Sequence, residues 1–482
     1  MDREECNGGI PARLMELGRM DDESKIRELA CLGLKALCVE VDSNKYSKKR
    51  VDQILVDEIV AEIDEKIGEY IDQILHQTEF QKKEAIWRSL YSLVKNTNFD
   101  ENIEIGILNV SMQDLKNDFN DCIDITQSGL YKKVYSEEYG QFGGSPYAVI
   151  VSNFEFTPNS SDIKLLKYIS AVSSVSHCPF IASASPKMLG LNSFEEVSAI
   201  KDMPSIFESP HHTDWRGLRE MEDSRYIALT LPRFLLREPY TAENNPISEF
   251  NYNEFIGGMH ENFLWGNASF LLATRIIDSF AKYRWCPNIV GPLGGGTVDD
   301  LPSYQFTRYG EYQTKIPVEV LISDRMEYEL SEQGFIPLIM RKTSNNAAFF
   351  SACSIQKPKK FGNGSNAKAM EENYKLGSQL PYLFIVTRLA HYIKVLQREN
   401  IGTWKSKPDI VKELNDWIRQ YVSDQENPPM IVRSKKPLRA ATVYVEQPEG
   451  EPGWYNVKLD IVPHFKYMGA NFTLTLKGRL DR

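Results

Sequence analysis

The sequence lacks the features that would anchor it in a membrane or cross-link it through disulfides. Its longest apolar runs, such as Tyr382–Val386, are far shorter than the ~18 residues that a membrane-spanning helix needs. The first residues, Met1–Cys6, are acidic and contain no apolar core, so we expect no signal peptide. The seven cysteines include no Cys-x-x-Cys pair, which suits reduced thiols. These absences predict a cytoplasmic protein.

An excess of positive charge is also missing. The 482 residues carry 56 basic and 66 acidic side chains, a formal net charge of −10. Nucleic acids and anionic membranes recruit proteins through positive charge, so we expect neither as a partner and no insertion into a membrane. Hydrophobic residues make up 42% of the chain and charged residues 25%, which is typical of a folded protein. At ~150 residues per domain, the chain has room for two to four domains.

Recognisable catalytic motifs are absent as well. The glycine cluster around Gly294 has neither the lysine of a P-loop nor the Gly-x-Gly-x-x-Gly spacing, so a tight turn is the favoured interpretation. Adjacent His211 and His212 would point to different sides of a helix, and Cys178 beside His177 has no carboxylate near it in sequence. We therefore assign no catalytic, cofactor-binding or metal-binding residue and expect no cofactor. The alternative is an α/β enzyme that uses the Gly294 loop with His177, Cys178 or His211.

The N-terminal 80 residues differ from the rest in charge and pattern. They hold 19 acidic and 11 basic side chains, a net charge of −8. Apolar residues recur every four positions from Leu55 to Leu75, which predicts a long amphipathic helix, and a shorter helix is predicted over Ser24–Val39. We assign residues 1–78 to an N-terminal helical segment that contacts a partner. A helical hairpin packed on the chain's own domain is an equal alternative.

Strands and helices alternate through the middle of the chain. Tyr147–Val151 and Pro179–Ala182 read as continuous apolar strands, and the isoleucines of residues 103–107 alternate as in a half-buried strand. Buried strands separated by helices indicate a largely parallel sheet. We assign residues 79–240 to an α/β domain and residues 241–365 to a mixed α/β domain.

The C-terminal part, residues 366–482, combines helices with the clearest β pattern of the chain. Helices are predicted over Leu380–Leu396 and Asp409–Val422. The apolar positions of the following strands, called the nine strand residues below, are Val443, Val445, Tyr455, Val457, Leu459, Ile461, Phe472, Leu474 and Leu476. A chain that ends on strands with one polar face offers an open sheet edge, which aggregates or accepts a partner strand. The predicted fold class is an α/β core with an N-terminal helical segment and a C-terminal β region.

A dense segment of mixed charge, Asp214–Tyr226, has two interpretations. Its pairs Arg216–Glu220 and Arg219–Asp223 have the spacing of ion pairs on a solvated helix face. The same charges around Trp215 and Tyr226 also fit the rim of an interface. The sequence favours neither.

Ten segments follow one another in the order and spacing of a known family. They are Ile74–Gln81, Trp87–Leu90, Ser176–Ala182, Asp223–Arg237, Phe263–Ala268, Phe335–Leu338, Gln356–Lys360, Leu380–Leu383, Leu414–Ile418 and Pro437–Leu438. The most specific of them is Asp223–Arg237, which reads DSRYIALTLPRFLLR. Over residues 50–480 the chain resembles the large sheath subunit of bacterial type VI secretion systems (TssC/VipB-type).

This resemblance implies a structural protein with a contractile-sheath-like fold, not an enzyme. Such a chain would pair with a small sheath subunit (TssB/VipA-type), and the heterodimers would stack on neighbouring copies into a helical tube in the cytoplasm. A heterologous interface that does not close into a ring generates such a filament. The tube would surround an inner tube of hexameric rings (Hcp-type), start from a baseplate and contract to propel the inner tube, without a cofactor.

The resemblance also implies roles for particular residues. The exposed residues of the Asp409–Val422 helix that would contact the inner tube are Lys412, Glu413, Asp416 and Arg419. The nine strand residues would take part in strand exchange between neighbouring subunits. The residues of the acidic N-terminal helix that an AAA+ unfoldase (ClpV-type) would recognise are Leu17, Ile26, Leu29 and Leu32. A phage-tail sheath protein is a further alternative, but the separate helical N-terminus argues against it.

Overall fold

The computed structural model describes residues 32–33, 53–247, 250–308, 311–342, 344–362, 367–403, 405–423, 425, 428–447 and 455–464. These residues belong to two compact units. Unit 1 consists of residues 53–74 and 240–255, and unit 2 consists of residues 75–239 and 256–464. The predicted Ser24–Val39 helix, apart from Leu32 and Gly33, and the strand predicted around Phe472–Leu476 lie outside the described residues.

Unit 1 is built on one long helix, α3 (Gln53–Leu75), which confirms the amphipathic helix predicted for this region. The phenol of Tyr252 donates a hydrogen bond of 2.5 Å to the Asp72 carboxylate, and the main-chain N–H of Phe255 donates to the same carboxylate over 3.3 Å. The Tyr252 ring also lies close to Gly68, where no side chain is in the way. The second segment of unit 1 therefore covers the face of α3 that carries Gly68 and Asp72.

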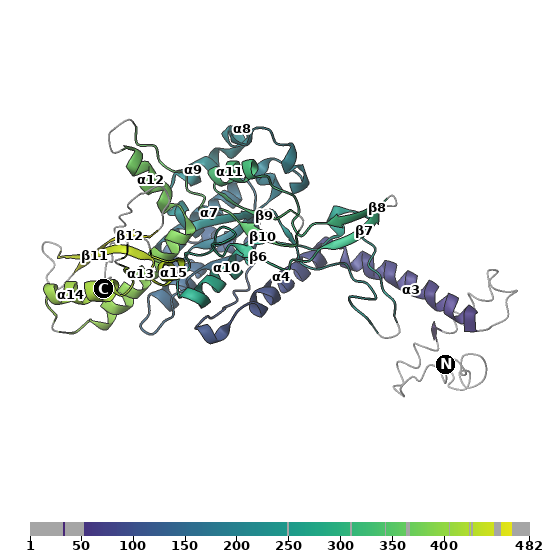
Figure 1. The fold of residues 1–482 in the computed structure, drawn as a ribbon, viewed down its shortest axis with the longest axis horizontal. Coiled ribbons are helices and arrows are strands. Elements are labelled where there is room, and N and C mark those ends of the chain that lie inside the picture. The colour runs from purple at the N-terminus through teal and green to yellow at the C-terminus, as the bar shows by residue number, and fades with distance from the viewer. Residues whose placement is uncertain are drawn as a thin grey trace. The chain divides into compact units, whose positions relative to one another are not determined.

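Unit 2 contains a six-stranded sheet (Figure 1). Its strands, in spatial order, are β1 (Ile150–Phe156), β2 (Phe180–Ala184), β3 (Ile227–Leu231), β9 (Phe335–Met340), β10 (Ala347–Phe349) and β6 (Thr297–Val298). The first four are parallel to one another, whereas β10 is antiparallel to both of its neighbours. The largely parallel sheet predicted from the apolar strands is therefore confirmed.

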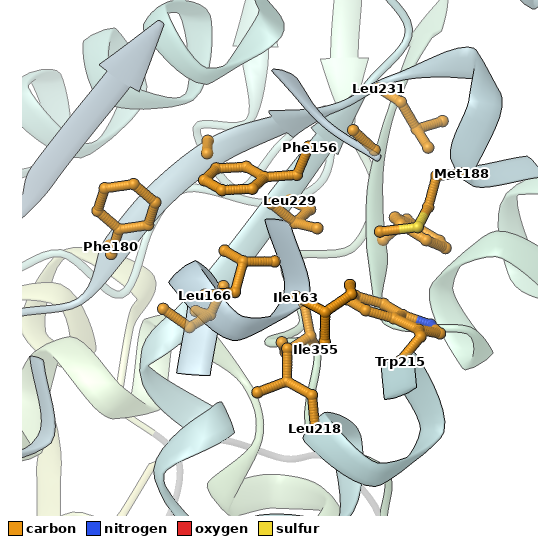
Figure 2. Packing of buried hydrophobic residues seen from close by; sticks show 14 of the residues in the cluster. Phe156, Ile163, Leu166, Phe180, Met188, Trp215, Leu218, Leu229, Leu231 and Ile355 are labelled. Carbon is orange, nitrogen blue, oxygen red and sulfur yellow. The ribbon is translucent and has the colours of Figure 1, made fainter. Parts of the chain in front are cut away.

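Both faces of this sheet are buried. On β3, Leu229 belongs to a hydrophobic cluster with residues of α7 (Ser160–Ser176) and α9 (Thr213–Glu220), whereas its neighbour Ala228 belongs to a cluster with α10 (Ala268–Tyr283). Successive side chains of a strand point to opposite faces, so helices on both sides explain why the strands read as continuous apolar runs. Figure 2 shows the first cluster, in which Trp215 lies near Leu218 and Ile163.

The C-terminal elements of unit 2 form a third hydrophobic cluster. Its elements are α13 (Leu380–Glu399), α14 (Lys407–Arg419), β11 (Leu438–Glu446) and β12 (Asn456–Pro463). β11 and β12 pair antiparallel as a two-stranded sheet, and α14 lies against β11, as Figure 1 shows in green and yellow. Pro408 sits in the first turn of α14, where its missing N–H has no helical acceptor in any case. Both predicted helices and the first predicted strands of this part are confirmed.

The other elements of unit 2 connect these layers. The remaining α-helices are α4 (Thr78–Lys95), α5 (Met112–Asp121), α6 (Gly129–Tyr131), α8 (Met203–Glu208), α11 (Asp324–Glu332), α12 (Ala367–Gly377) and α15 (Met430–Lys435). The other helical turns are η1 (Phe99–Glu101), η2 (Ile125–Gln127), the π-helix η3 (Lys132–Tyr139), η4 (Pro186–Leu189), η5 (Phe194–Ala199), η6 (Pro210–His212), η7 (Asp223–Tyr226) and η8 (His260–Asn262). Two short antiparallel pairs join β4 (Phe234–Leu235) to β5 (Trp265–Gly266) and β7 (Tyr304–Arg308) to β8 (Glu311–Lys315).

The strand predicted from Ile103, Ile105 and Ile107 is wrong, because residues 103–110 contain no regular element. Alternation predicts an extended backbone with one buried face, but a strand also needs a neighbour to pair with. No such neighbour lies among the described residues. The domain boundaries at residues 78, 240 and 365 stay predictions.

The packing of β9 against α9 leads to a test of the core. Phe335 is fully buried, and its ring stacks on Trp215 with centroids 5.6 Å apart and planes at 12°. We expect Phe335→Ala to destabilise unit 2 by about 3–5 kcal/mol, because it removes an aromatic ring and leaves a cavity. Thermal unfolding followed by circular dichroism measures the loss. Leu293→Ala is the control, since Leu293 is 92% exposed and its truncation should change stability by less than about 0.5 kcal/mol. Equal melting temperatures for the two variants would contradict this account of the core.

Candidate functional site

The Gly294 loop is a tight turn that packs against its own sheet. The N–H of Gly291 donates to the carbonyl oxygen of Phe349 over 2.7 Å, and the N–H of Phe349 donates to the carbonyl oxygen of Gly296 over 3.0 Å. Gly295 has φ = +88°, and a Cβ at Gly294 would collide with the main chain of Val290. Glycine is therefore required by the close approach of the backbone to itself, which confirms the tight-turn interpretation.

His177 and Cys178 lie in a buried position between α7 and β2. Cys178 has no exposed surface, and burial raises the pKa of its thiol far above the usual range. A thiol in such surroundings stays protonated and is a poor nucleophile. Burial also lowers the pKa of His177 to about 3, helped by the neighbouring His391 and Lys394, so this imidazole is a weak base.

The neighbours of His177 form a buried aromatic cluster. His177 Nδ1 lies 3.2 Å from the hydroxyl of Tyr226, and His391 Nε2 lies 3.0 Å from the carbonyl oxygen of Ser176. The Tyr139 ring, at the end of η3, is in contact with both imidazoles. Burial lowers the pKa of His391 to about 4. None of these residues belongs to the surroundings of the Gly294 loop, so the structure does not bring together the groups of the enzyme alternative.

His211 and His212 diverge, as the sequence predicts. His212 is buried, with Nε2 2.9 Å from the carbonyl oxygen of Met188 and Nδ1 3.0 Å from the hydroxyl of Ser209, whereas His211 is exposed. In the part of the chain that the structure describes, no group of three or more His, Cys, Asp or Glu side chains could hold a metal ion.

The two ion pairs predicted within the mixed-charge segment Asp214–Tyr226 do not form. Trp215 is fully buried, and the guanidinium of Arg219 is buried and donates to the carbonyl oxygens of Ile355 and Glu332. Arg216 donates to main-chain carbonyl oxygens of the preceding residues, not to Glu220. These arginines join elements inside unit 2, whereas other charged residues of the segment are exposed, and the interface rim stays a prediction.

A second buried charge network was not visible in the sequence. The side chain of Glu319 is fully buried and receives two hydrogen bonds from Arg233, at 2.7 and 2.9 Å, while His260 Nε2 lies 2.9 Å away. Burial opposes ionisation of Glu319, but the hydrogen bonds from His260 and Arg233 outweigh it and lower the pKa. Residues 233, 260 and 319 do not belong to a common motif, so no sequence pattern predicts that they form a network.

The α14 surface carries the residues assigned to the inner tube. Lys412, Asp416 and Arg419 are exposed, and Arg419 Nη1 lies 3.7 Å from Asp416 Oδ1. Glu413 differs from the prediction of an exposed contact: it is half-buried, and its carboxylate accepts a 2.6 Å hydrogen bond from Lys405. Three of the four residues are therefore free to face another molecule.

The strand residues within the described part of the chain point inward. Val443, Val445, Val457, Leu459 and Ile461 are buried in the cluster with α13 and α14, and Tyr455 is half-buried beside them. Phe472, Leu474 and Leu476 lie outside the described residues. These side chains hold the two-stranded sheet on its own domain, so an exchange of strands would use the main chain.

The two edges of the β11–β12 sheet differ. On β11, the side-chain amide of Asn415 donates to the carbonyl oxygen of Val443 and accepts from its N–H, both over 3.0 Å. The main-chain N–H and C=O groups of Val443 therefore point away from β12. Val443 and Leu459 form a non-hydrogen-bonded pair, so the main-chain groups of Leu459 likewise point away from β11. The same holds for Val457 and Ile461, and we call the main chain of these three residues the β12 edge. Within the described residues the β12 edge has no hydrogen-bond partner.

α3 carries an apolar stripe on the side away from Gly68 and Asp72. The exposed members of this stripe, called the α3 stripe, are Val60, Ile63, Ile67, Tyr70 and Ile74. They recur at intervals of three and four residues, which places them on one face of the helix. Their exposed fractions run from 37% for Ile63 to 67% for Tyr70. Within the described residues, nothing covers this stripe.

No described helix combines the length and the apolar composition that a membrane span requires.

Comparisons with known proteins identify the class. Residues 57–356 match the family model VipB, described as the EvpB/VC_A0108 tail sheath N-terminal domain. Residues 369–480 match VipB_2, described as the EvpB/VC_A0108 tail sheath gpW/gp25-like domain. The two models together cover most of the chain, and they define a tail sheath protein with an α/β core and a C-terminal β region.

A curated relative identifies the family within this class of tail sheath proteins. The chain is 40% identical over 430 residues to the type VI secretion system sheath protein TssC1 of Pseudomonas aeruginosa (strain PAO1). The aligned region covers 88% of this chain and 86% of the relative. This chain belongs to the TssC/VipB family of large sheath subunits of type VI secretion systems. The family is one of structural proteins, and this membership replaces the phage-tail alternative.

Two solved structures share a weaker similarity. One is the baseplate of the anti-feeding prophage, with a TM-score of 0.38 at 10% identity over 80% of this chain and 84% of the other. The second is the contracted helical sheath of the same particle, with a TM-score of 0.30 at 12% identity over 67% and 68%. These similarities are too low to carry an argument, so the family is assigned from the sequence matches.

The buried histidine cluster predicts a dependence of stability on pH. His177 and His391 have pKa values of about 3 and about 4 when folded, against 6.5 as the ordinary value. The unfolded chain therefore binds more protons below pH 6.5, so this contribution to stability is complete above pH 6.5 and is lost between pH 6.5 and about 3. By pH 5 the loss is on the order of 2 kcal/mol per histidine. We expect His391→Gln, which keeps a donor for Ser176, to melt with a shallower dependence on pH than the natural protein.

The control is His211→Gln, because His211 is exposed and lies outside the buried cluster. Melting temperatures between pH 8 and pH 5 compare the three proteins, and the carboxylates contribute equally to each. If His391→Gln and His211→Gln follow the same curve, the cluster does not control acid stability.

Proposed function

We propose that this chain pairs with a small sheath subunit (TssB/VipA-type) and that the heterodimers polymerise in the cytoplasm into a helical tube. The tube surrounds an inner tube of hexameric proteins (Hcp-type), starts from a baseplate and contracts to propel the inner tube. Membership of the TssC/VipB family supports this proposal. The chain acts in it as a structural subunit without catalysis or a cofactor.

The observation that carries the proposal is the α3 stripe. One face of α3 is already covered by Tyr252 and Phe255 of unit 1, whereas the stripe on the other side has no cover within the described residues. Its three-and-four spacing suits a partner helix, whose apolar side chains would pack between Ile63, Ile67 and Tyr70. Burying one such side chain contributes about 1.5–3 kcal/mol, so the stripe is sufficient for a stable pair.

Polymerisation requires a second kind of contact, and the β12 edge is suited to it. The main chain of Val457, Leu459 and Ile461 has no hydrogen-bond partner among the described residues and could accept a strand, whereas the β11 edge is occupied by Asn415 at Val443. A strand from a neighbouring subunit would extend the sheet through main-chain hydrogen bonds. Such bonds would hold neighbouring subunits together through the main chain, without a requirement for particular side chains.

The α14 surface is proposed as the contact with the inner tube. Lys412, Asp416 and Arg419 are exposed and are individually weak contacts, since surface ion pairs contribute about 0–1 kcal/mol each. Many weak contacts between the sheath and the inner tube would hold the inner tube before contraction and allow its release afterwards. Glu413 is proposed to support this surface through Lys405 and to contribute little directly.

Recycling by an AAA+ unfoldase (ClpV-type) is proposed at the N-terminus. Of the four residues assigned to this role, Leu32 lies in a described helical turn and is 66% exposed, while Leu17, Ile26 and Leu29 lie outside the described residues. An exposed leucine on a helix is a suitable element of such a recognition site.

Co-expression with the small subunit encoded beside this chain tests the proposal. We expect long hollow tubules in negative-stain electron microscopy, and we expect Ile67→Asp to abolish both capture of the small subunit and the tubules. The control is Ala61→Asp, which adds the same charge to an exposed position on the other side of α3. Tubules that survive Ile67→Asp would remove the α3 stripe from the proposal, and a soluble single chain that never captures the small subunit would overturn the proposal itself.

Charge reversal on α14 tests the inner-tube contact. We expect the double variant Lys412→Glu and Arg419→Glu to leave the melting temperature and the heterodimer unchanged, because both side chains are exposed. Sheaths assembled on purified inner tube should then fall at least about tenfold in number at low salt, and the difference from the natural protein should shrink at high salt, because salt screens exposed charges. The control is Lys357→Glu on a distant loop. Equal assembly by both variants would contradict a role for α14.

A further inference from the structure

A pocket in unit 2 carries an excess of positive charge. Its volume is about 500 Å³, and it is lined by residues of α8, α9, the end of α11, the loop before α12 and α12 itself. Seven of the lining side chains are lysine or arginine and four are glutamate, although the chain as a whole has a net charge of −10. We call this concavity the α12 pocket. Charge of one sign that is gathered in a concave surface attracts a partner of the opposite sign.

Two lysines of the α12 pocket are available to such a partner. Lys360, shortly before α12, and Lys368, in its first turn, are both exposed. Neither forms an ion pair with any residue that the structure describes. By contrast, Lys375 at the other end of α12 is paired with Glu332 over 2.7 Å. That pair removes one lysine and one glutamate, so the excess of positive charge among the lining residues is unchanged.

The matching negative surface lies on α3, which has the largest net negative charge of the described helices. Its 23 residues include seven carboxylates and one lysine. Glu65 and Glu69 are exposed, and within the described part of the chain neither forms an ion pair. Being four residues apart, they are neighbours on one face of the helix. Each is two residues from Ile67, which places both about 160° around α3 from the α3 stripe. A small subunit bound to the α3 stripe would therefore leave them open.

We propose that Glu65 and Glu69 of one copy of this chain dock at Lys360 and Lys368 in the α12 pocket of a second copy. The two surfaces are different, so the contact is heterologous and can repeat from copy to copy along a filament. This inference rests on the proposed function and deepens it, because it names a contact between neighbouring copies.

The charge of the chain favours a second copy as the occupant. Two copies that each carry a net charge of −10 repel one another, so stacked copies need a place where opposite charges meet. The acidic face of α3 and the α12 pocket provide that place within a single sequence. Because exposed ion pairs are screened by salt, assembly through this contact should weaken as the salt concentration rises.

Reversal of charge on each side, and then on both, tests the contact. The chain is co-expressed with the small subunit, and tubules are counted by negative-stain electron microscopy. We expect the double variant Lys360→Glu and Lys368→Glu to capture the small subunit with an unchanged melting temperature, because both side chains are exposed. Its tubules should fall at least about tenfold in number, and those of the double variant Glu65→Lys and Glu69→Lys equally so. The quadruple variant restores opposite charges and should recover at least about half of the tubules.

The matched control reverses two exposed lysines that do not line the α12 pocket, Lys167→Glu and Lys187→Glu, and should assemble as the natural protein does. Normal tubules in either double variant, or no recovery in the quadruple variant, would overturn the contact and leave the proposed function standing. If the natural chain forms neither heterodimer nor tubules, the proposed function itself is rejected.

Zero-length crosslinking provides a measurement without any substitution. Tubules assembled from a mixture of ¹⁵N-labelled and unlabelled copies are treated with a carbodiimide, which joins a carboxylate to a lysine in contact with it. We expect peptides that link Glu65 or Glu69 to Lys360 or Lys368 and combine the two isotopes, because the partners belong to different copies. Crosslinks of these lysines to the small subunit or only within one copy, or no crosslink to α3 at all, would overturn the proposal.

Discussion

The structure depends on one sheet that is buried on both faces. Ile181, Ala228 and Ile336 face one set of helices, while Phe180, Leu229 and Phe335 face the other, so the central strands β2 and β3 are buried along their whole length. Hydrophobic burial on this scale is the largest favourable contribution to the stability of unit 2. The groups that we propose for assembly accordingly lie on peripheral elements: α3, α14 and the β12 edge.

The buried polar groups join segments of unit 2 that are far apart in the sequence. Arg219 donates to main-chain carbonyl oxygens, Glu319 is held ionised by Arg233 and His260, and His177 is kept neutral beside His391. Breaking one partner of such a group leaves a buried polar atom without a hydrogen bond, which costs about 1–3 kcal/mol, so these groups join distant segments of the chain. They explain why residues of catalytic types occur in a member of a structural family.

The hydrophobic periodicity of the sequence predicted the helices and strands that bury one side. The helical periodicity of α3, α4 and α13 and the alternation of β11 and β12 appear in the sequence because each element buries one face or stripe. The same rule failed for residues 103–107 and for Asp214–Tyr226. In the first, the side chains alternate but no described strand is near enough to pair; in the second, charged side chains reach carbonyl oxygens more than a hundred residues away, as from Arg219 to Ile355.

The sequence by itself determined the class of protein, the helices and strands with clear periodicity, and an acidic charge balance, from which we expect no nucleic acid as a main partner. Its ordered segments, above all Asp223–Arg237, pointed to the family because β3 within them is fully buried and tolerates few side chains. Only the tertiary structure decided the environment of particular groups: that the described strand residues face inward, that Asn415 occupies the β11 edge, and that Glu413 is paired with Lys405. Exposure depends on contacts between residues far apart in the chain, and no local pattern encodes those contacts.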